Sequence, residues 1–159
     1  MLPAVTKKAA RCLKEGAAVA VNVRRQDLAA EVLAATDGRG ADLIIDSVGG
    51  EAFDRSLDCV AFEGRIVVVG FSSGKVPVLS AVSLLRQNAT VTGLSWGEHY
   101  PRRAPELVAA VYDELFVMLE QEIIVPRVDT VGFGEVPEAL ARLAERRTTG
   151  KLVCNVAGD

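Results

Sequence analysis

Short apolar runs alternate with helical patterns along the first two thirds of the chain, and this alternation constrains the fold more than any other feature. The runs lie at residues 18–21, 43–46, 65–69 and 91–94. Those at 43–46 and 65–69 are almost continuously apolar, which is typical of strands buried on both faces of a parallel sheet. Strands that alternate with helices at short spacing indicate an open parallel α/β sheet. Right-handed crossovers would place helices on both faces.

The segments between the runs carry signals for helices and turns. Asp27 is placed to cap a helix whose apolar positions are Leu28, Val32 and Leu33. The sequence Asp-Gly-Arg-Gly at 37–40 predicts the turn that ends this helix. A Glu-Gly pair at 63–64 predicts the turn into the strand at 65–69. Further helices are expected over residues 51–60, 81–87, 104–120 and 135–147.

After Trp96 the pattern changes, and strong helical patterns take over from the alternating strands and helices. Pro105 and Pro137 fall in the first turns of the last two predicted helices, where proline is tolerated. A short closing strand is expected at 151–154, after Gly150. No internal repeat, low-complexity tract or linker interrupts the 159 residues, so we expect a single domain over 1–159.

Composition and charge argue against several classes of function. Lys plus Arg number 18 and Asp plus Glu 21, which gives a net charge of −3, and aromatic residues make up 5%. A mildly acidic chain with few aromatic residues is not expected to bind nucleic acid. The apolar runs are too short to span a bilayer, and the first residues do not resemble a signal peptide, so a cytoplasmic location without membrane contact is expected.

The cysteines do not predict a metal site. Cys12, Cys59 and Cys154 are widely spaced, no Cys-x-x-Cys pair occurs, and the single histidine, His99, has no cysteine near it. Free thiols in a reducing compartment are the expected state, and no zinc ligands are assigned. His99 has no orienting partner in the sequence, so no catalytic role is assigned to it.

Three loops rich in glycine and serine follow the predicted strands, at residues 46–50, 70–74 and 95–97. Ligands of open α/β sheets bind outside the carboxyl ends of the strands, and glycine lets a flat ligand approach the backbone. The loops therefore favour a nucleotide or cofactor site, although these residues also turn the chain in any α/β protein. Asp46 is expected to brace its turn. No Gly-x-Gly-x-x-Gly, Walker A or Gly-x-Ser-x-Gly motif is present.

The order of these segments resembles a known family. The segments at 38–50 (GRGADLIIDSVGG), 64–74 (GRIVVVGFSSG) and 149–153 (TGKLV) are similar to those of the medium-chain dehydrogenase/reductase superfamily, in its quinone oxidoreductase branch. This branch is alcohol dehydrogenase-like and independent of zinc. The stretch from Lys8 to Asn22 also resembles its family counterpart. Each motif is weak alone, but together they cover nearly the whole chain.

The resemblance implies an incomplete Rossmann-type doubly wound parallel sheet that lacks the first strand and its Gly-rich turn, plus C-terminal helices. Residues 1–159 would then be a partial dinucleotide-binding domain with helices at 104–120 and 135–147 and a closing strand. The N-terminal catalytic domain would be absent. Under this interpretation the parent protein is an NADPH-dependent oxidoreductase, and this chain is not expected to be catalytic alone.

The resemblance also implies a set of cofactor contacts. Lys8 would bind the phosphate on the adenosine ribose, and Arg146 or Arg147 would lie near the cofactor. The cofactor would be NADPH and would supply the hydride, so no catalytic side chain is required. The family often has tyrosine where this chain has Val23. The remaining expected contacts lie beside the adenosine ribose (Ser47, Val48 and Gly49) and along the nicotinamide half (Gly70, Phe71, Ser72 and Ser73).

The implied partners are a quinone or enone substrate and a second copy of the chain. Family members often form homodimers through the edge strand that corresponds to 90–95, and this segment carries no charge that would block edge pairing. Two alternatives stay open: a non-catalytic remnant that associates with itself, and an unrelated α/β nucleotide-binding module.

Overall fold

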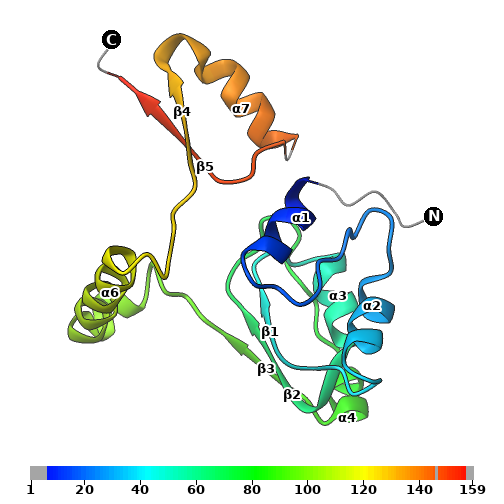
Figure 1. Ribbon diagram of the computed structural model, residues 1–159. Coiled ribbons are helices and arrows are strands. Elements are labelled where there is room, and N and C mark those ends of the chain that lie inside the picture. Colours follow the sequence, from blue (N-terminus) through cyan, green and yellow to red (C-terminus); the bar gives the residue numbers. More distant parts are fainter. Residues whose placement is uncertain (1–6, 146, 157–159) are drawn as a thin grey trace. The chain divides into compact units, whose positions relative to one another are not determined.

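The computed structural model describes residues 7–145 and 147–156, and the chain divides into two compact units (Figure 1). The first unit extends to Ala104, and the second begins at Pro105. Each unit has its own parallel sheet. The predicted α/β class with parallel strands is therefore confirmed.

The sheet of the first unit contains β1 (Ala41–Asp46), β2 (Val60–Val68) and β3 (Thr90–Gly93). Its strand order is β1-β2-β3, and both neighbouring pairs are parallel. Because the strands are parallel, their carboxyl ends meet at one edge of the sheet, where the loops that follow them must also lie. β3 is an edge strand of this sheet, as predicted for the 90–95 segment.

Five helices of the first unit lie in the described residues: α1 (Lys7–Lys14), α2 (Leu28–Ala35), α3 (Glu51–Leu57), α4 (Ala81–Gln87) and α5 (Tyr100–Arg103). The predicted cap of α2 is confirmed. The Asp27 carboxylate accepts hydrogen bonds from the backbone N–H groups of Ala29, at 2.9 Å, and Ala30, at 3.2 Å. These bonds satisfy two donors that a helix start leaves unpaired.

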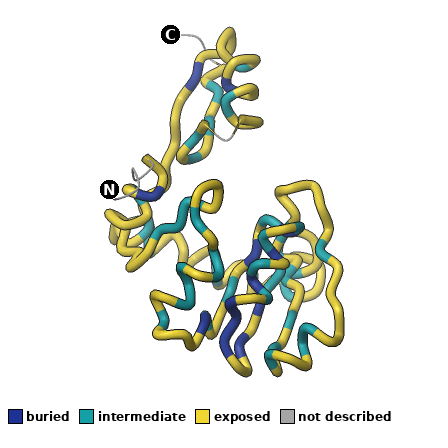
Figure 2. The backbone as a smooth tube through the Cα atoms, turned by 90° about the vertical axis from the view of Figure 1, so that its right-hand side faces the viewer, coloured by how far each residue is buried: buried dark blue, intermediate teal, exposed yellow. Residues whose placement is uncertain are grey.

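The core of this unit lies where α3 packs on the sheet (Figure 2). Phe53 of α3 is 1% exposed and contacts the buried side chains of Val60 and Ile66 from β2. Burying an aromatic or aliphatic side chain of this size contributes roughly 1.5–3 kcal/mol. Ile44 of β1 and Val91 of β3 pack against the same cluster, so one face of all three strands contributes to one core.

The opposite face of β1 departs from the sequence prediction. Leu43 and Ile45 are 58% and 59% exposed, whereas Ile44 between them packs against the core. Successive side chains of a strand point to opposite faces, and α3 packs on the Ile44 side. The expected burial of this strand on both faces is therefore wrong for Leu43 and Ile45.

Three expected element boundaries are also corrected. Residues 18–21 form no strand, because a strand needs a hydrogen-bonded neighbour and β1 pairs only with β2 in the described chain. The helix expected over 51–60 ends at Leu57, and Val60 already begins β2. The expected turn at 63–64 lies inside β2, where Glu63 has a φ of +59° and the pairing with β1 shifts in register.

The second unit contains α6 (Pro105–Glu120), β4 (Val128–Gly132), a short 3-10 helix (Phe133–Glu135), α7 (Val136–Ala144) and β5 (Lys151–Asn155). The helix expected over 104–120 and the closing strand are confirmed, whereas the helix expected over 135–147 is shorter. β4 was not predicted. It pairs in parallel with β5, and Val131 and Ala139 are buried where α7 packs on β4.

Gly150 allows the two strands of this unit to approach. The backbone N–H of Lys151 donates to the carbonyl oxygen of Arg127 at 2.8 Å. A Cβ on Gly150 would lie 2.5 Å from that same oxygen, so only glycine fits at this position.

Among the helices of the described chain, none combines the length and the apolar character that crossing a membrane would require.

Candidate functional site

The loops that follow β1 and β2 are joined by backbone hydrogen bonds at the carboxyl edge of the sheet. The N–H groups of Ser72 and Ser73 donate to the carbonyl oxygens of Ser47, at 3.1 Å, and Val48, at 3.0 Å. Where the strands end, the N–H of Val69 donates to the carbonyl oxygen of Asp46 at 2.8 Å, and the N–H of Leu94 donates to the carbonyl oxygen of Val68 at 2.9 Å. The first two predicted loops are therefore joined, and the third leaves the sheet beside the end of β2.

Asp46 braces the first of these loops, as predicted. Its side chain belongs to a residue only 5% exposed, and Oδ1 accepts hydrogen bonds from the N–H groups of Val48, at 2.8 Å, and Gly49, at 3.0 Å. A buried carboxylate needs such donors to compensate for lost hydration. The turn at 46–49 is thus fixed from within.

Gly49 and Gly50 have positive φ angles of 69° and 54°, which most other residues adopt only with strain. A Cβ on Gly49 would lie 2.7 Å from the carbonyl oxygen of Lys75, in the second loop. The first loop therefore packs directly on the second, and Gly49 is required by the chain's own backbone. Ser73 Oγ accepts a hydrogen bond from the N–H of Lys75 at 3.2 Å, which holds the second loop in place.

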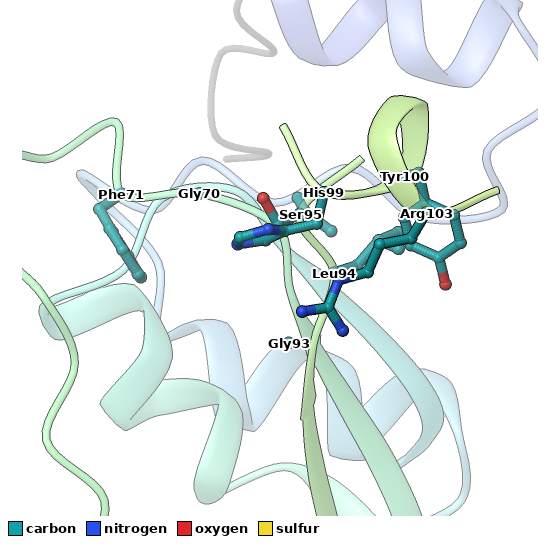
Figure 3. Close-up of a pocket in the computed structure, with 9 residues that line it drawn as sticks. Gly70, Phe71, Gly93, Leu94, Ser95, His99, Tyr100 and Arg103 are labelled. Atoms are coloured by element: carbon teal, nitrogen blue, oxygen red, sulfur yellow. The ribbon is translucent and has the colours of Figure 1, made fainter. Parts of the chain in front are cut away.

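A hollow of about 590 Å³ opens at the ends of β2 and β3 (Figure 3). In Figure 3, Phe71 lies at one end of the hollow and Arg103 at the other, with His99 between them. Its size falls within the range of about 300–1,000 Å³ that is usual for small-molecule sites. The lining residues come from the second and third loops and from α5: Val69, Gly70, Phe71, Gly93, Leu94, Ser95, His99, Tyr100 and Arg103.

Gly70 and Gly93 line this hollow, and the surrounding protein would have room for a Cβ at either position. A Cβ on Gly70 would meet only the Ser47 carbonyl oxygen, at an ordinary contact of 3.6 Å, and a Cβ on Gly93 would meet no atom within 4 Å. Neither residue has a positive φ. The missing side chains leave open backbone against which a flat ligand can lie.

Aromatic packing fixes the start of α5 beside the hollow. The rings of Trp96 and Tyr100 have centroids 5.0 Å apart and an interplanar angle of 33°. The backbone N–H of His99 donates to the carbonyl oxygen of Ser95 at 3.2 Å. These contacts hold the third loop and α5 together.

The structure brings together seven of the nine cofactor residues named from the sequence. Gly70 and Phe71 line the hollow, and the other five lie in the joined loops: Ser47, Val48, Gly49, Ser72 and Ser73. Lys8 is exposed in the first turn of α1 and does not line this hollow. Arg146 lies outside the described residues. Their contacts with a cofactor remain predictions.

Sequence reasoning did not include His99 and Arg103 in the site. They stand four residues apart, a spacing that places side chains on the same side of a helix. α5 spans only four residues, too few for an apolar pattern to reveal it. The sequence did contain one signal for these site residues: a histidine and an arginine four positions apart, just after a predicted strand and its loop.

The described residues do not gather metal ligands, since they contain no group of three or more His, Cys, Asp or Glu side chains suited to a metal ion. Cys12, Cys59 and Cys154 are free thiols. Burial raises the pKa of the Cys59 thiol, and the nearby carboxylates of Asp58 and Asp27 raise this pKa further. We therefore assign no step to a zinc ion at these residues.

Comparison with known proteins extends these observations. Residues 4–113 match the family described as zinc-binding dehydrogenase. The chain is 34% identical over 142 residues to quinone oxidoreductase-like protein 2 homolog of Nematostella vectensis, a match that covers 88% of this chain and 39% of the relative. It is 33% identical over 150 residues to quinone oxidoreductase of Pseudomonas aeruginosa, covering 92% and 45%. The chain thus spans less than half the length of these relatives.

A solved structure shows the same fold. The crystal structure of Escherichia coli quinone oxidoreductase complexed with NADPH matches with a TM-score of 0.83 and 27% sequence identity, covering 96% of this chain and 48% of that one. The chain therefore has a partial Rossmann-like fold of the kind found in the cofactor-binding part of quinone oxidoreductases.

Proposed function

The chain belongs to the zinc-binding dehydrogenase family, among the quinone oxidoreductase-like members of the medium-chain dehydrogenase/reductase superfamily, and on this premise we propose that it is the NADPH-binding part of a quinone or enone reductase. One observation carries the proposal: at the carboxyl edge of a parallel sheet, the loops after β2 and β3 border a hollow lined by two glycines that the fold itself does not require, and the loop after β1 is hydrogen-bonded to the loop after β2. Open α/β sheets bind their ligands at this edge. Because the chain belongs to this family, the alternative of an unrelated α/β nucleotide-binding module is excluded.

In this proposal each loop contacts a different part of the cofactor. Ser47, Val48 and Gly49 would lie beside the adenosine ribose, whose phosphate Lys8 would bind. Gly70 and Phe71 would lie along the nicotinamide ring, since both line the hollow. The list of proposed contacts is completed by Ser72, Ser73 and Arg146.

When bound, NADPH supplies a hydride to the quinone or activated alkene, and a proton from solvent completes the reduction. The residues of this chain have a different task, which is to bind and orient. The bare backbone at Gly70 and the exposed ring of Phe71 offer a flat surface for one face of the nicotinamide. In this proposal the described residues of the chain bind and orient the cofactor.

Titration of the purified chain with NADPH and with NADH, followed by nicotinamide fluorescence, tests the proposal. We expect both cofactors to bind and NADPH to bind more tightly. The variant Lys8→Ala should reduce that preference, because it removes a positive charge proposed to contact the extra phosphate. Absence of binding by either cofactor refutes the proposed function.

A second candidate, self-association, is favoured by β3. This strand pairs only with β2 in the described residues, and the segment 90–95 carries no charged side chain on its free edge. We propose a homodimer paired along this edge, which is compatible with cofactor binding. The mass in solution should correspond to two chains, and Thr92→Lys should shift it to one. A stable dimer that binds neither cofactor would support the non-catalytic remnant.

We also propose a cytoplasmic location, because three thiols without disulfide partners suit a reducing compartment.

A further inference from the structure

The hollow at the ends of β2 and β3 has two chemically different ends. Phe71 and Leu94 contribute apolar surface, whereas α5 contributes the side chains of His99 and Arg103. In Figure 3 the guanidinium group of Arg103 extends from α5 toward Gly93, and the ring of His99 lies between it and Phe71 in this view. A ligand that fills the hollow would therefore meet an apolar surface at one end and nitrogen donors at the other.

The backbone of α5 places His99 and Arg103 one helical turn apart. The N–H of Arg103 donates to the carbonyl oxygen of His99 at 3.1 Å, which is the hydrogen bond of one turn. Side chains at this spacing have Cβ atoms about 5–6 Å apart. The ring contact between Trp96 and Tyr100 holds the start of this helix. One small group in the hollow is therefore within reach of both side chains.

No acidic side chain balances the charge at this end of the hollow. The lining contains neither Asp nor Glu, and Arg103 is its only arginine. Among the described residues, no carboxylate oxygen lies within 4.0 Å of a side-chain nitrogen of Arg103. Glu98 and Glu106 flank α5 in the sequence, but neither lines the hollow. The N–H donors of this guanidinium are therefore available to a ligand.

Such a set of donors suits a carboxylate. The planar guanidinium presents paired N–H groups that match the two carboxylate oxygens, and these charge-assisted bonds are stronger than neutral ones. The imidazole of His99 adds a further donor. The single charge of Arg103 balances the single charge of a carboxylate, whereas a phosphate monoester would bring about two. A neutral ligand would leave the guanidinium uncompensated.

The order of the strands indicates which ligand would reach this end. The sheet order is β1-β2-β3, so the loops follow one another along its carboxyl edge in the same order. In the proposed function the adenosine ribose lies at the first loop and the nicotinamide at the second. The third loop and α5 then lie beyond the nicotinamide, which is the terminal group of the cofactor. An acceptor must approach this ring to about 3–3.5 Å, so it would extend toward α5.

We propose that Arg103 and His99 bind a carboxylate of the electron acceptor and hold its ring or double bond against the nicotinamide. The preferred substrate is then an acidic quinone or an unsaturated acid, and its neutral analogue binds more weakly. The inference rests on the proposed function and names the substrate class for it. Both side chains act by binding and orientation, since the hydride comes from the cofactor.

Anthraquinone-2-carboxylate and anthraquinone-2-carboxamide form a matched pair of probes, because they share a flat ring system and differ in charge. Trp96 is the only tryptophan of the chain and packs against Tyr100, which lines the hollow. A quinone bound there should quench its fluorescence. The full chain is titrated in the presence of excess NADP+, which has no hydride to donate and leaves the probe unreduced. We expect the carboxylate to bind about tenfold more tightly than the carboxamide.

Variants of the two side chains test their roles. Arg103→Gln should weaken binding of the carboxylate probe about tenfold, the change expected for one lost hydrogen bond between charged groups. Arg103→Lys, which keeps the charge but loses the paired donors, should give an intermediate loss. His99→Ala should weaken binding about threefold, since it removes a weaker donor. Binding of the carboxamide and affinity for NADPH should not change in any of these variants.

Arg102→Gln is the matched control. Arg102 is the neighbouring arginine of the same helix, is exposed, has no ion pair in the described chain and does not line the hollow. The variant removes the same charge one position away, so binding of the carboxylate probe should be unchanged. Far-UV circular dichroism verifies that each variant is folded.

The outcomes distinguish this inference from the proposed function. If NADPH binds but both probes bind equally or not at all, or if Arg103→Gln keeps wild-type affinity for the carboxylate, the inference is overturned and the proposed function stands. The inference is also overturned if Arg102→Gln has the same effect as Arg103→Gln, or if Arg103→Gln weakens NADPH binding to the same extent. If NADPH does not bind the wild-type chain, the proposed function fails and the assignment of an electron acceptor to this site fails with it.

Discussion

Replacing Gly70 with valine should separate cofactor binding from stability. Gly70 lines the hollow, has no positive φ, and its added Cβ would meet only the Ser47 carbonyl oxygen, at 3.6 Å. The folded chain therefore has room for the added Cβ. Replacing glycine where the new residue fits without strain stabilises a protein by about 0.4–1 kcal/mol, because the unfolded chain loses freedom. The free energy of unfolding should stay equal or rise slightly.

Binding should change in the opposite direction. A ring packed on the backbone of Gly70 would have its atoms about 3.5–4.0 Å away, and the valine methyl groups would occupy this space. Forcing extra carbon atoms into a packed contact costs about 1–3 kcal/mol. Affinity for NADPH should therefore fall roughly five- to hundredfold. The assays are nicotinamide fluorescence for binding and urea denaturation, followed by circular dichroism, for stability.

Gly97→Val provides the control for this experiment. Gly97 lies in the third loop of the same unit, its added Cβ would meet no atom within 4 Å, and it does not line the hollow. This variant should bind NADPH as the wild type does. The reasoning is refuted if folded Gly70→Val protein keeps wild-type affinity, or if Gly97→Val loses affinity to the same extent.

Two further predictions concern the loops and the core. Asp46→Ala should lower the free energy of unfolding by about 3 kcal/mol in a urea titration, because it leaves the buried N–H of Gly49 and the half-buried N–H of Val48 without their charged acceptor. Asp46→Asn keeps one acceptor oxygen and should lose less than half as much, and equal losses would contradict this role. The raised pKa of Cys59, caused first by burial and then by Asp58 and Asp27, favours the thiol in the folded state. The contribution of the buried Cys59 thiol to the free energy of unfolding is therefore complete below the unfolded pKa of about 8.5. This contribution is lost as pH rises through the folded pKa. The urea midpoint should fall more steeply above pH 8.5 in wild type than in Cys59→Ala, and parallel curves would exclude this effect.

Local patterns were sufficient to predict the elements whose cause is local. The cap at Asp27 and the buried brace at Asp46 both act within three residues of the capping side chain, so neighbouring residues contain the whole signal. The parallel order of β1, β2 and β3 follows from their spacing and from the helices between them. The three loops at their ends could be named for the same reason.

The errors arose where structure depends on distant partners. The run at 18–21 has the composition of a strand, but composition cannot supply the hydrogen-bonded neighbour that a strand requires. The register shift in β2, with Glu63 at positive φ, is set by pairing with β1 and leaves no pattern in the sequence. β4 was missed because its five residues gain their stability from β5, about twenty positions later.

The candidate site likewise has parts that local sequence predicts and parts that depend on residues far apart in the chain. The glycine- and serine-rich loops could be found because each follows its own strand. The contribution of α5 could not, because His99 and Arg103 line the same hollow as Gly70 and Phe71 only in the folded chain.

The first loop connects the two proposed ends of the cofactor. On one side, the carbonyl oxygens of Ser47 and Val48 accept hydrogen bonds from the loop that leads to the hollow. On the other side, the same loop leads into α3, whose Phe53 is buried against Val60 and Ile66 of β2. All residues that line the hollow lie before Pro105, within the first unit. The proposed contacts along the nicotinamide half therefore belong to a unit with its own sheet and its own core.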